Sequence, residues 1–153
     1  MEFLGHIVSH DGVKIDTNKI KVIKEWKVPT TIKELRGFLG LTGYNRKFVK
    51  NYGRIAAPIT KLLKKYTFSW TPKATKAFEH LKEEMCLAPI LAMPDFTKTF
   101  IVECDASRNG IGVVLMQEGR PITFESFSIK GKHLKKAIYE KEILAILHAL
   151  KKW

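Results

Sequence analysis

The stretch FIVECDASRNGIGVVLMQ, residues 100–117, contains two runs of strand-forming residues separated by a turn. Its β-branched and aromatic residues give way at 107–110 to small and turn-forming ones, and a second turn signal follows at 118–120. This spacing predicts an antiparallel meander of three strands, Thr99–Asp105, Gly110–Gln117 and Pro121–Ser128. From Leu134 to Trp153 the apolar residues instead follow the period of a long helix.

Two carboxylates in this part of the chain stand where an acidic side chain needs an explanation. Glu142 falls within the apolar face of the expected long helix, and Asp105 ends the first expected strand beside the turn. Burying an ionised carboxylate requires a raised pKa, a cationic partner or a metal. If the helix crosses the sheet, both side chains converge and offer oxygen ligands that suit Mg²⁺ in a phosphodiester hydrolase.

The residues alone leave a second interpretation open. Asp105 could cap a helix and Glu142 could pair with a basic residue, because a two-metal site normally needs more than two carboxylates. Glu103 is a competing ligand, since strand alternation places it on the same face as Asp105. We rank it below Asp105 because it lies further from the strand end.

The first 93 residues carry mainly helical signals. A short hairpin, Phe3–Val8 with Val13–Ile15, precedes helices expected over 16–26, over 32 to about 52, over 56–65 and from Pro72 onward. The sequence Thr30-Thr31-x-x-Glu34 has the form of a capping box. Pro89 and Pro94 break the helical pattern, which predicts a boundary near Pro94.

The helix expected to begin at residue 32 has a glycine every third residue, at Gly37, Gly40 and Gly43. Each glycine costs about 1 kcal/mol relative to alanine in a helix interior, so a close approach of some kind is expected to compensate. Arg36, Arg46 and Lys47 belong to the same stretch. A bare stripe bordered by cations could therefore lie against a sugar-phosphate backbone, or the glycines could allow close helix packing.

Charge and composition narrow the classes of function. The chain has 153 residues and a formal net charge of +12, with 14 basic and 3 acidic residues at positions 14–65 but 10 and 7 at positions 93–153. This favours a nucleic-acid partner for the first part. His6 and His10 lack a third metal ligand, and Cys86 and Cys104, without zinc spacing, are expected to be buried thiols. No membrane span or signal segment is evident, so an intracellular location is expected.

The chain resembles the gypsy-type LTR retrotransposon polyprotein over nearly its whole length. The resemblance rests on ordered blocks: FLGHIVS (3–9), KELRGFLGLTGY (33–44), IAAPI (55–59), FSWT (68–71), APIL (88–91), DAS (105–107), GIGVVLMQ (110–117) and YEKEILAI (139–146). It implies an α+β chain in which residues 1–65 are the end of the reverse transcriptase palm and the thumb. Residues 66–93 would be a connecting helix and linker, and 94–153 the N-terminal half of a ribonuclease H-like domain.

The resemblance also implies roles for particular residues. The thumb would grip a template-primer duplex or RNA:DNA hybrid through Arg36, Gly37, Gly40, Gly43, Tyr44, Arg46 and Lys47, with Ser107 as a further nucleic-acid contact. Asp105 and Glu142 would be the first and second acidic ligands of a site that holds two Mg²⁺ ions and cleaves the RNA of a hybrid. The rest of the polyprotein would be a partner of this segment, and no interaction with a membrane is expected.

Departures from the family pattern limit what this chain is expected to do alone. The polymerase aspartates would lie before Met1 and the later ribonuclease H aspartates beyond Trp153, so an inactive fragment is expected. Glu125-Ser126-Phe127 stands where the family usually has Phe-Ser-Arg, and Cys104 where Thr is common. A catalytically inactive, basic nucleic-acid-binding remnant, or a gene fragment without a selected function, stays open as an alternative.

Overall fold

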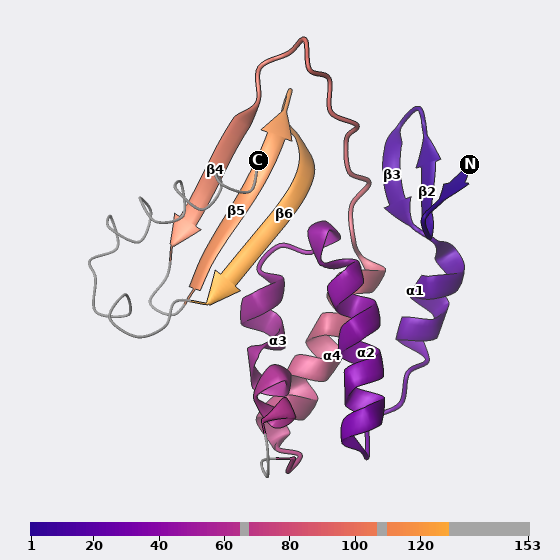
Figure 1. Cartoon of the computed structure of the whole chain (residues 1–153), viewed down its shortest axis with the longest axis vertical. Helices are drawn as coiled ribbons and strands as arrows, with labels where there is room; N and C mark the ends of the chain where they lie inside the picture. Colours follow the sequence, from indigo (N-terminus) through magenta and orange to yellow (C-terminus); the bar gives the residue numbers. More distant parts are fainter. Residues whose placement is uncertain (65–67, 107–109, 129–153) are drawn as a thin grey trace.

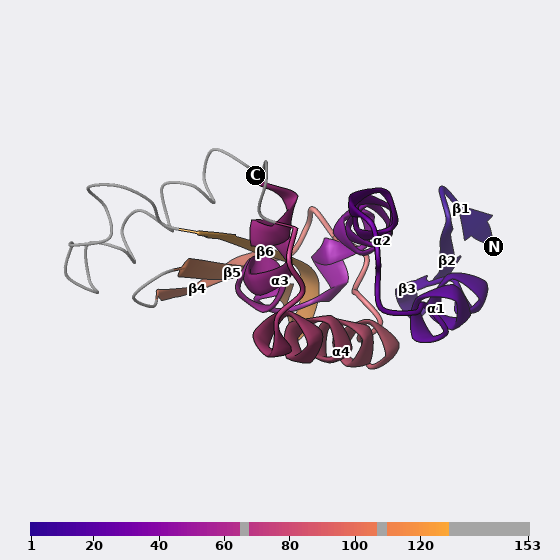
Figure 2. The same cartoon turned by 90° about the horizontal axis from the view of Figure 1, so that it is seen from below.

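The computed structural model describes residues 1–64, 68–106 and 110–128. Ser107 and the long helix expected from Leu134, with its Glu142, lie outside these residues. The described elements form two three-stranded antiparallel sheets, which lie on opposite sides of the molecule, above the helices in the view of Figure 1 (Figures 1 and 2). Among the described residues, no helix is long and apolar enough to cross a membrane.

The N-terminal sheet contains β1 (Glu2–Phe3), β2 (His6–Ser9) and β3 (Gly12–Ile15), in that order. The prediction of one strand over Phe3–Val8 was therefore wrong. The chain turns at Leu4 and Gly5, whose φ angles are +49° and +78°, and β1 folds back onto β2. Glycine adopts this left-handed backbone without steric cost, which explains a turn inside an apparently continuous strand pattern.

Helix α1 (Thr17–Lys24) follows, and Asp16 caps it by accepting a hydrogen bond from the backbone N–H of Asn18. Helix α2 (Ile32–Tyr44) begins with the predicted capping box. The backbone N–H of Glu34 donates to Thr31 Oγ1 at 3.2 Å, and Glu34 accepts in return from the Thr30 backbone at 2.8 Å. These bonds satisfy N–H groups that have no partner within the helix.

The prediction that this helix continues to about residue 52 was wrong, because it ends at Tyr44. Asn45 is fully buried, and its side chain donates back to the Leu41 carbonyl at 3.0 Å. A 3₁₀ turn, η1 (Arg46–Phe48), follows, and Asn51 then turns the chain with a φ of +60°. Helix α3 (Tyr52–Thr60) therefore begins earlier than predicted, and it ends in a second 3₁₀ turn, η2 (Lys61–Leu63).

Helix α4 (Pro72–Cys86) confirms the amphipathic pattern read from the sequence, with one face fully or almost fully buried, namely Ala74, Ala77, Phe78, Leu81 and Met85. The centre of the core is aromatic. The ring of Phe78 lies 4.6 Å from that of Phe38 on α2, and Trp26 packs edge-on against Phe38 at 5.8 Å. The helices thus share one core, and Phe124 from the second sheet packs against it.

The second sheet is the predicted meander, with β4 (Ile101–Ala106), β5 (Gly110–Gln117) and β6 (Arg120–Ser128) in sequential antiparallel order. Its register pairs Asp105 with Gly112 and Gly112 with Ser126. Cys104 on β4 and Cys86 on α4 are both only half-buried, which corrects the expectation of full burial.

Residues 91–95, called the strap below, connect the two sheets. Val13 of β3 exchanges two backbone hydrogen bonds with Leu91, each 2.8 Å long, and the N–H of Ala92 donates to the Pro121 carbonyl of β6 at 2.8 Å. The buried side chain of Gln117 bonds both the N–H and the carbonyl of Asp95. The strap is therefore fixed at both sides instead of being a loose linker.

Candidate hydrolytic and nucleic-acid site

Asp105 lies near the end of β4, as the sequence predicted, but its side chain is exposed, so its charge needs no buried partner. Alternation along the strand puts Glu103 on the same face, and it is exposed as well. Among the described residues, no hydrogen bond or ion pair engages the Asp105 carboxylate. Convergence with Glu142 stays a prediction, since Glu142 is not among the described residues.

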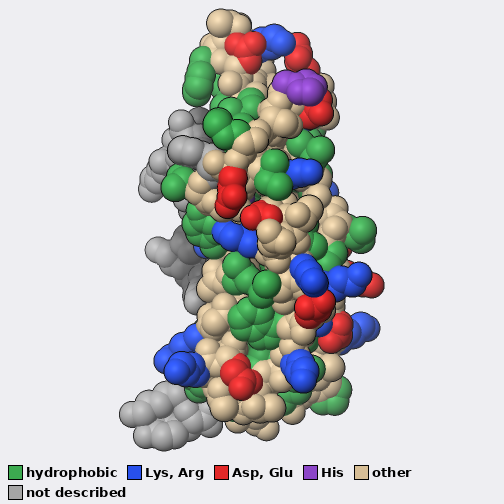
Figure 3. All heavy atoms as spheres, turned by 90° about the vertical axis from the view of Figure 1, so that its right-hand side faces the viewer, with side chains coloured by type: hydrophobic (Ala, Val, Ile, Leu, Met, Phe, Trp, Pro, Cys, Tyr) green, Lys and Arg blue, Asp and Glu red, His purple; other side chains and the backbone are tan. Residues whose placement is uncertain are grey.

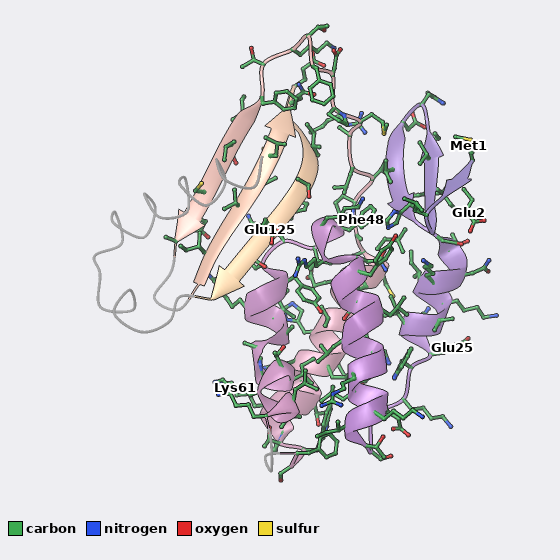
Figure 4. The ribbon with its side chains drawn as sticks, in the orientation of Figure 1. Met1, Glu2, Glu25, Phe48, Lys61 and Glu125 are labelled. Carbon is green, nitrogen blue, oxygen red and sulfur yellow. The ribbon has the colours of Figure 1, made fainter. Side chains whose placement is uncertain are left out.

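A cavity of about 110 Å³ opens beside this carboxylate. Lys50 and Asn51, from the corner between η1 and α3, line it together with Glu103 and Asp105 of β4. Figure 4 shows Glu125, a further lining residue, on β6 where the sheet meets the upper end of α3. The cavity therefore lies where the helical part of the chain meets the second sheet.

The two carboxylates beside the cavity are of the chemical type that binds Mg²⁺, but they are too few to form a metal site. Glu103 and Asp105 supply the hard oxygen donors that this ion prefers. Within residues 1–64, 68–106 and 110–128, however, no group of three or more His, Cys, Asp or Glu side chains could hold a metal ion. The described part of the chain thus offers two carboxylates of the type that Mg²⁺ prefers, without forming a complete metal site.

The three glycines of α2 do not all support the same interpretation, since two of them serve packing within the protein and the third is open to solvent. A Cβ on Gly37 would stand 3.5 Å from the Trp26 ring, and one on Gly43 would stand 3.5 Å from the Tyr52 hydroxyl, so both positions are in ordinary packing contact. A Cβ on Gly40, by contrast, would have no neighbouring atom within 4 Å. Gly40 lies on an exposed strip of α2 that also carries Lys33, Arg36 and Tyr44. This strip is open to a ligand.

Arg46 and Lys47 lie on η1 and not on α2, which corrects the expectation that they continue the glycine helix. Arg46 is exposed. Lys47 is half-buried, with its ammonium 5.4 Å from the centre of the Phe48 ring, and burial lowers the pKa of Lys47. Figure 3 shows other Lys and Arg side chains gathered mostly over the lower half of one face, at the level of the helices.

Tyr44 is half-exposed, but its hydroxyl is committed to the N-terminal sheet, since it donates to the Leu4 carbonyl at 2.7 Å. Its ring stacks on His6 with 5.5 Å between centroids, and the Lys19 ammonium lies 5.2 Å from the Tyr44 ring centre. These contacts hold the β1–β2 turn against α2, and about half of the Tyr44 surface stays exposed.

His6 is a packing histidine, as the sequence favoured, and only 7% of its surface is exposed. Its Nε2–H donates to Asn45 Oδ1 at 3.1 Å, because the Asn45 amide nitrogen is already used by Leu41. His10, by contrast, is exposed beside Asp11. The sequence offered no signal for the His6–Asn45 bond, which joins residues 39 positions apart.

Burial lowers the pKa of His6 below its ordinary value of 6.5, with further lowering by Lys47 and Lys19, while the bond to Asn45 acts the other way. As pH falls through 6.5, His6 therefore binds a proton in the unfolded chain before it does so in the folded chain. Folding stability should be fully present above pH 6.5 and decrease below it. We expect the melting temperature to drop less between pH 7.5 and 5.5 in His6→Gln than in the wild type.

The control for this prediction is His10→Gln, which removes an exposed imidazole and should keep the wild-type drop. Equal drops in all three proteins would show that His6 does not contribute to the pH dependence.

Comparison with known proteins places this geometry in a family. Residues 70–153 match the family described as "RNase H-like domain found in reverse transcriptase". The chain is 48% identical over 151 residues to the retrovirus-related Pol polyprotein from transposon 297 of Drosophila melanogaster, covering 97% of this chain and 14% of that protein. It is 41% identical to the polyprotein from transposon gypsy of the same species, covering 99% and 16%.

Solved structures agree over the same span. A foamy viral protease-reverse transcriptase in complex with double-stranded DNA has a TM-score of 0.89 at 26% identity, covering 99% of this chain and 28% of that one. The foamy viral enzyme in complex with an RNA/DNA hybrid gives 0.88 at 26% identity, covering 99% and 21%. The chain spans about a seventh of the length of the first transposon relative. It belongs to the retrotransposon Pol polyproteins, as a segment that includes the RNase H-like domain of their reverse transcriptase.

Proposed function

We propose that this chain holds a nucleic-acid duplex against α2 and contributes Asp105 to Mg²⁺-dependent hydrolysis of the RNA strand of an RNA:DNA hybrid within its parent reverse transcriptase. The main support is the unpaired Asp105 carboxylate, exposed at the end of β4 beside a cavity. The relatives named above support the family of reaction, and the foamy viral complex named with an RNA/DNA hybrid supports the substrate class.

In this proposal Asp105 and Glu142 hold the metal, with Glu103 as the nearest competing ligand. Bound Mg²⁺ would stabilise negative charge on the scissile phosphate and activate water. Ser107 and the exposed strip of α2 would contact the nucleic acid. Completion of the two-metal site, and all polymerase chemistry, are assigned to other parts of the parent protein.

The binding half of the proposal predicts a loss of affinity when the charge of α2 is reversed. Lys33 and Arg36 are exposed on that helix, so Lys33→Glu combined with Arg36→Glu should weaken binding of a labelled RNA:DNA hybrid about tenfold or more. Fluorescence anisotropy across a series of salt concentrations measures this, and the slope of log affinity against log salt should also become shallower.

A matched control lies on α4. Lys73→Glu with Lys76→Glu reverses two exposed charges at the same three-residue spacing on another helix. Equal losses in the two double variants would mean that net charge, and not α2, determines binding.

An inactive nucleic-acid-binding remnant is the second candidate. The charge of positions 14–65 favours it, and it predicts the same binding behaviour without any cleavage.

A further inference from the structure

Asn51 immediately precedes α3, at the N-cap position, but its side chain does not cap that helix. Its backbone has a φ of +60°, a conformation that asparagine adopts more readily than most residues. The backbone N–H of Gly53, in the first turn of α3, donates instead to Ser126 Oγ of β6, at 2.8 Å and 73 residues away in the sequence. A residue at the N-cap position usually accepts this hydrogen bond with its own side chain. Because Ser126 accepts it here, the Asn51 side-chain amide is available for another contact.

This amide faces the hydrolytic side of the second sheet. A Cβ on Gly112 would stand only 2.5 Å from Asn51 Oδ1, so the Asn51 amide lies directly over that glycine. Gly112 is the antiparallel partner of Asp105, and paired residues project from the same face of a sheet. Asn51 and Asp105 therefore open onto one cavity, although they come from different parts of the fold.

Lys50 adds a positive charge to the same cavity. It is exposed, and among the described residues it forms no ion pair with Glu103, Asp105 or any other carboxylate. The Asn51 amide likewise has no side-chain hydrogen bond there. A free ammonium and a free amide beside carboxylates of the metal-binding type form a complementary surface for a phosphodiester, whose oxygens accept hydrogen bonds from both groups.

We propose that Lys50 and Asn51 bind the sugar-phosphate backbone of the nucleic-acid strand next to Asp105, so that the helical part of the chain supplies part of the hydrolytic site. This inference rests on the proposed function, and it adds two substrate-contacting residues from outside the RNase H-like sheet. A side chain at position 112 would displace the Asn51 amide from its place over β5.

Three substitutions separate contact with substrate from a structural role. Lys50→Ala removes the charge. Asn51→Asp keeps size and tolerance of the left-handed backbone but places a negative charge toward the phosphate. Asn51→Gly keeps the backbone conformation and removes only the amide. Lys73→Ala on α4, which removes an exposed lysine outside the cavity, is the matched control.

The test measures binding of a labelled RNA:DNA hybrid to the full 153-residue chain by anisotropy over a salt series. Lys50→Ala should weaken binding about threefold to tenfold and reduce the salt slope by about 0.9, more than Lys73→Ala does. Asn51→Asp should weaken it at least as much and Asn51→Gly less. All variants should melt as the wild type does.

A second readout is the NMR signal of the Asn51 side-chain amide, assigned by its loss in Asn51→Asp. It should shift on addition of the hybrid while that of Asn18, exposed on α1, does not. If Lys50→Ala and Asn51→Asp bind as tightly as the wild type while the α2 double variant loses affinity, this inference is overturned and the proposed function stands. If the chain does not bind the hybrid, both are overturned.

Discussion

Asp105→Asn should lower cleavage of the RNA strand of a hybrid by about a hundredfold or more in a parent reverse transcriptase that carries this chain. The substitution keeps the size of the side chain but removes the charge that would hold Mg²⁺. A metal ion contributes several kcal/mol to stabilising charge in such reactions, and each 1.36 kcal/mol corresponds to about a tenfold change in rate. Hybrid affinity should change little, because α2 and not Asp105 provides the basic surface.

The measurement is single-turnover cleavage of a labelled hybrid in Mg²⁺, with binding scored separately by anisotropy. Asp11→Asn is the matched control, since Asp11 is exposed in the β2–β3 turn and its carboxylate contacts only the exposed His10 among the described residues. Glu103→Gln tests the competing ligand and should keep most of the activity. Undiminished cleavage by Asp105→Asn, or a larger loss in Glu103→Gln, would reject Asp105 as the principal ligand.

Phe38→Ala should reduce the free energy of unfolding by about 3–5 kcal/mol, the usual cost of removing a buried phenylalanine. Phe38 has no exposed surface and joins Trp26, α2 and α4 in one aromatic cluster. Its ring cannot be replaced by neighbours without moving a helix. Since domains of this size are stable by only about 5–15 kcal/mol, much of the total would be lost.

Urea denaturation followed by tryptophan fluorescence measures this loss. Phe96→Ala provides the same chemical change at a side chain that is 85% exposed, and it should cost about 0.5 kcal/mol or less. A loss below about 1 kcal/mol in Phe38→Ala would mean that the aromatic cluster is not the centre of the core.

Local patterns in the sequence predicted the elements that depend on local signals. The capping box at Thr31 and Glu34, the buried face of α4 and the order of the meander are all confirmed. The similarity to solved reverse transcriptase structures also confirms the mixed helical and RNase H-like fold class. The division at residues 65 and 93 and the pairing of Asp105 with Glu142 stay predictions.

What the sequence could not predict depends on contacts between distant residues. Helix α2 ends because Asn45 is buried against His6, and nothing in the helical pattern around Tyr44 signals that partner. The same holds for Asn51, which the sequence pattern assigned to a continuing helix. Its actual place before α3 depends on Ser126, which accepts a hydrogen bond from the Gly53 N–H and lies far away in the sequence. One pointer existed, since Gly112 lies inside a strand, and glycine there often marks a close approach of another backbone or side chain.

The strap constrains how elements of this kind can exchange segments. Leu91 continues the hydrogen bonding of β3, while Ala92 and Asp95 are bonded to β6 and β5. These bonds use the backbone of the strap, so they tolerate a change of side chain there but not a change of length. An inserted or deleted residue would break one set of bonds or shift one sheet relative to the other. Segments exchanged between related retrotransposons should therefore keep the length of residues 91–95.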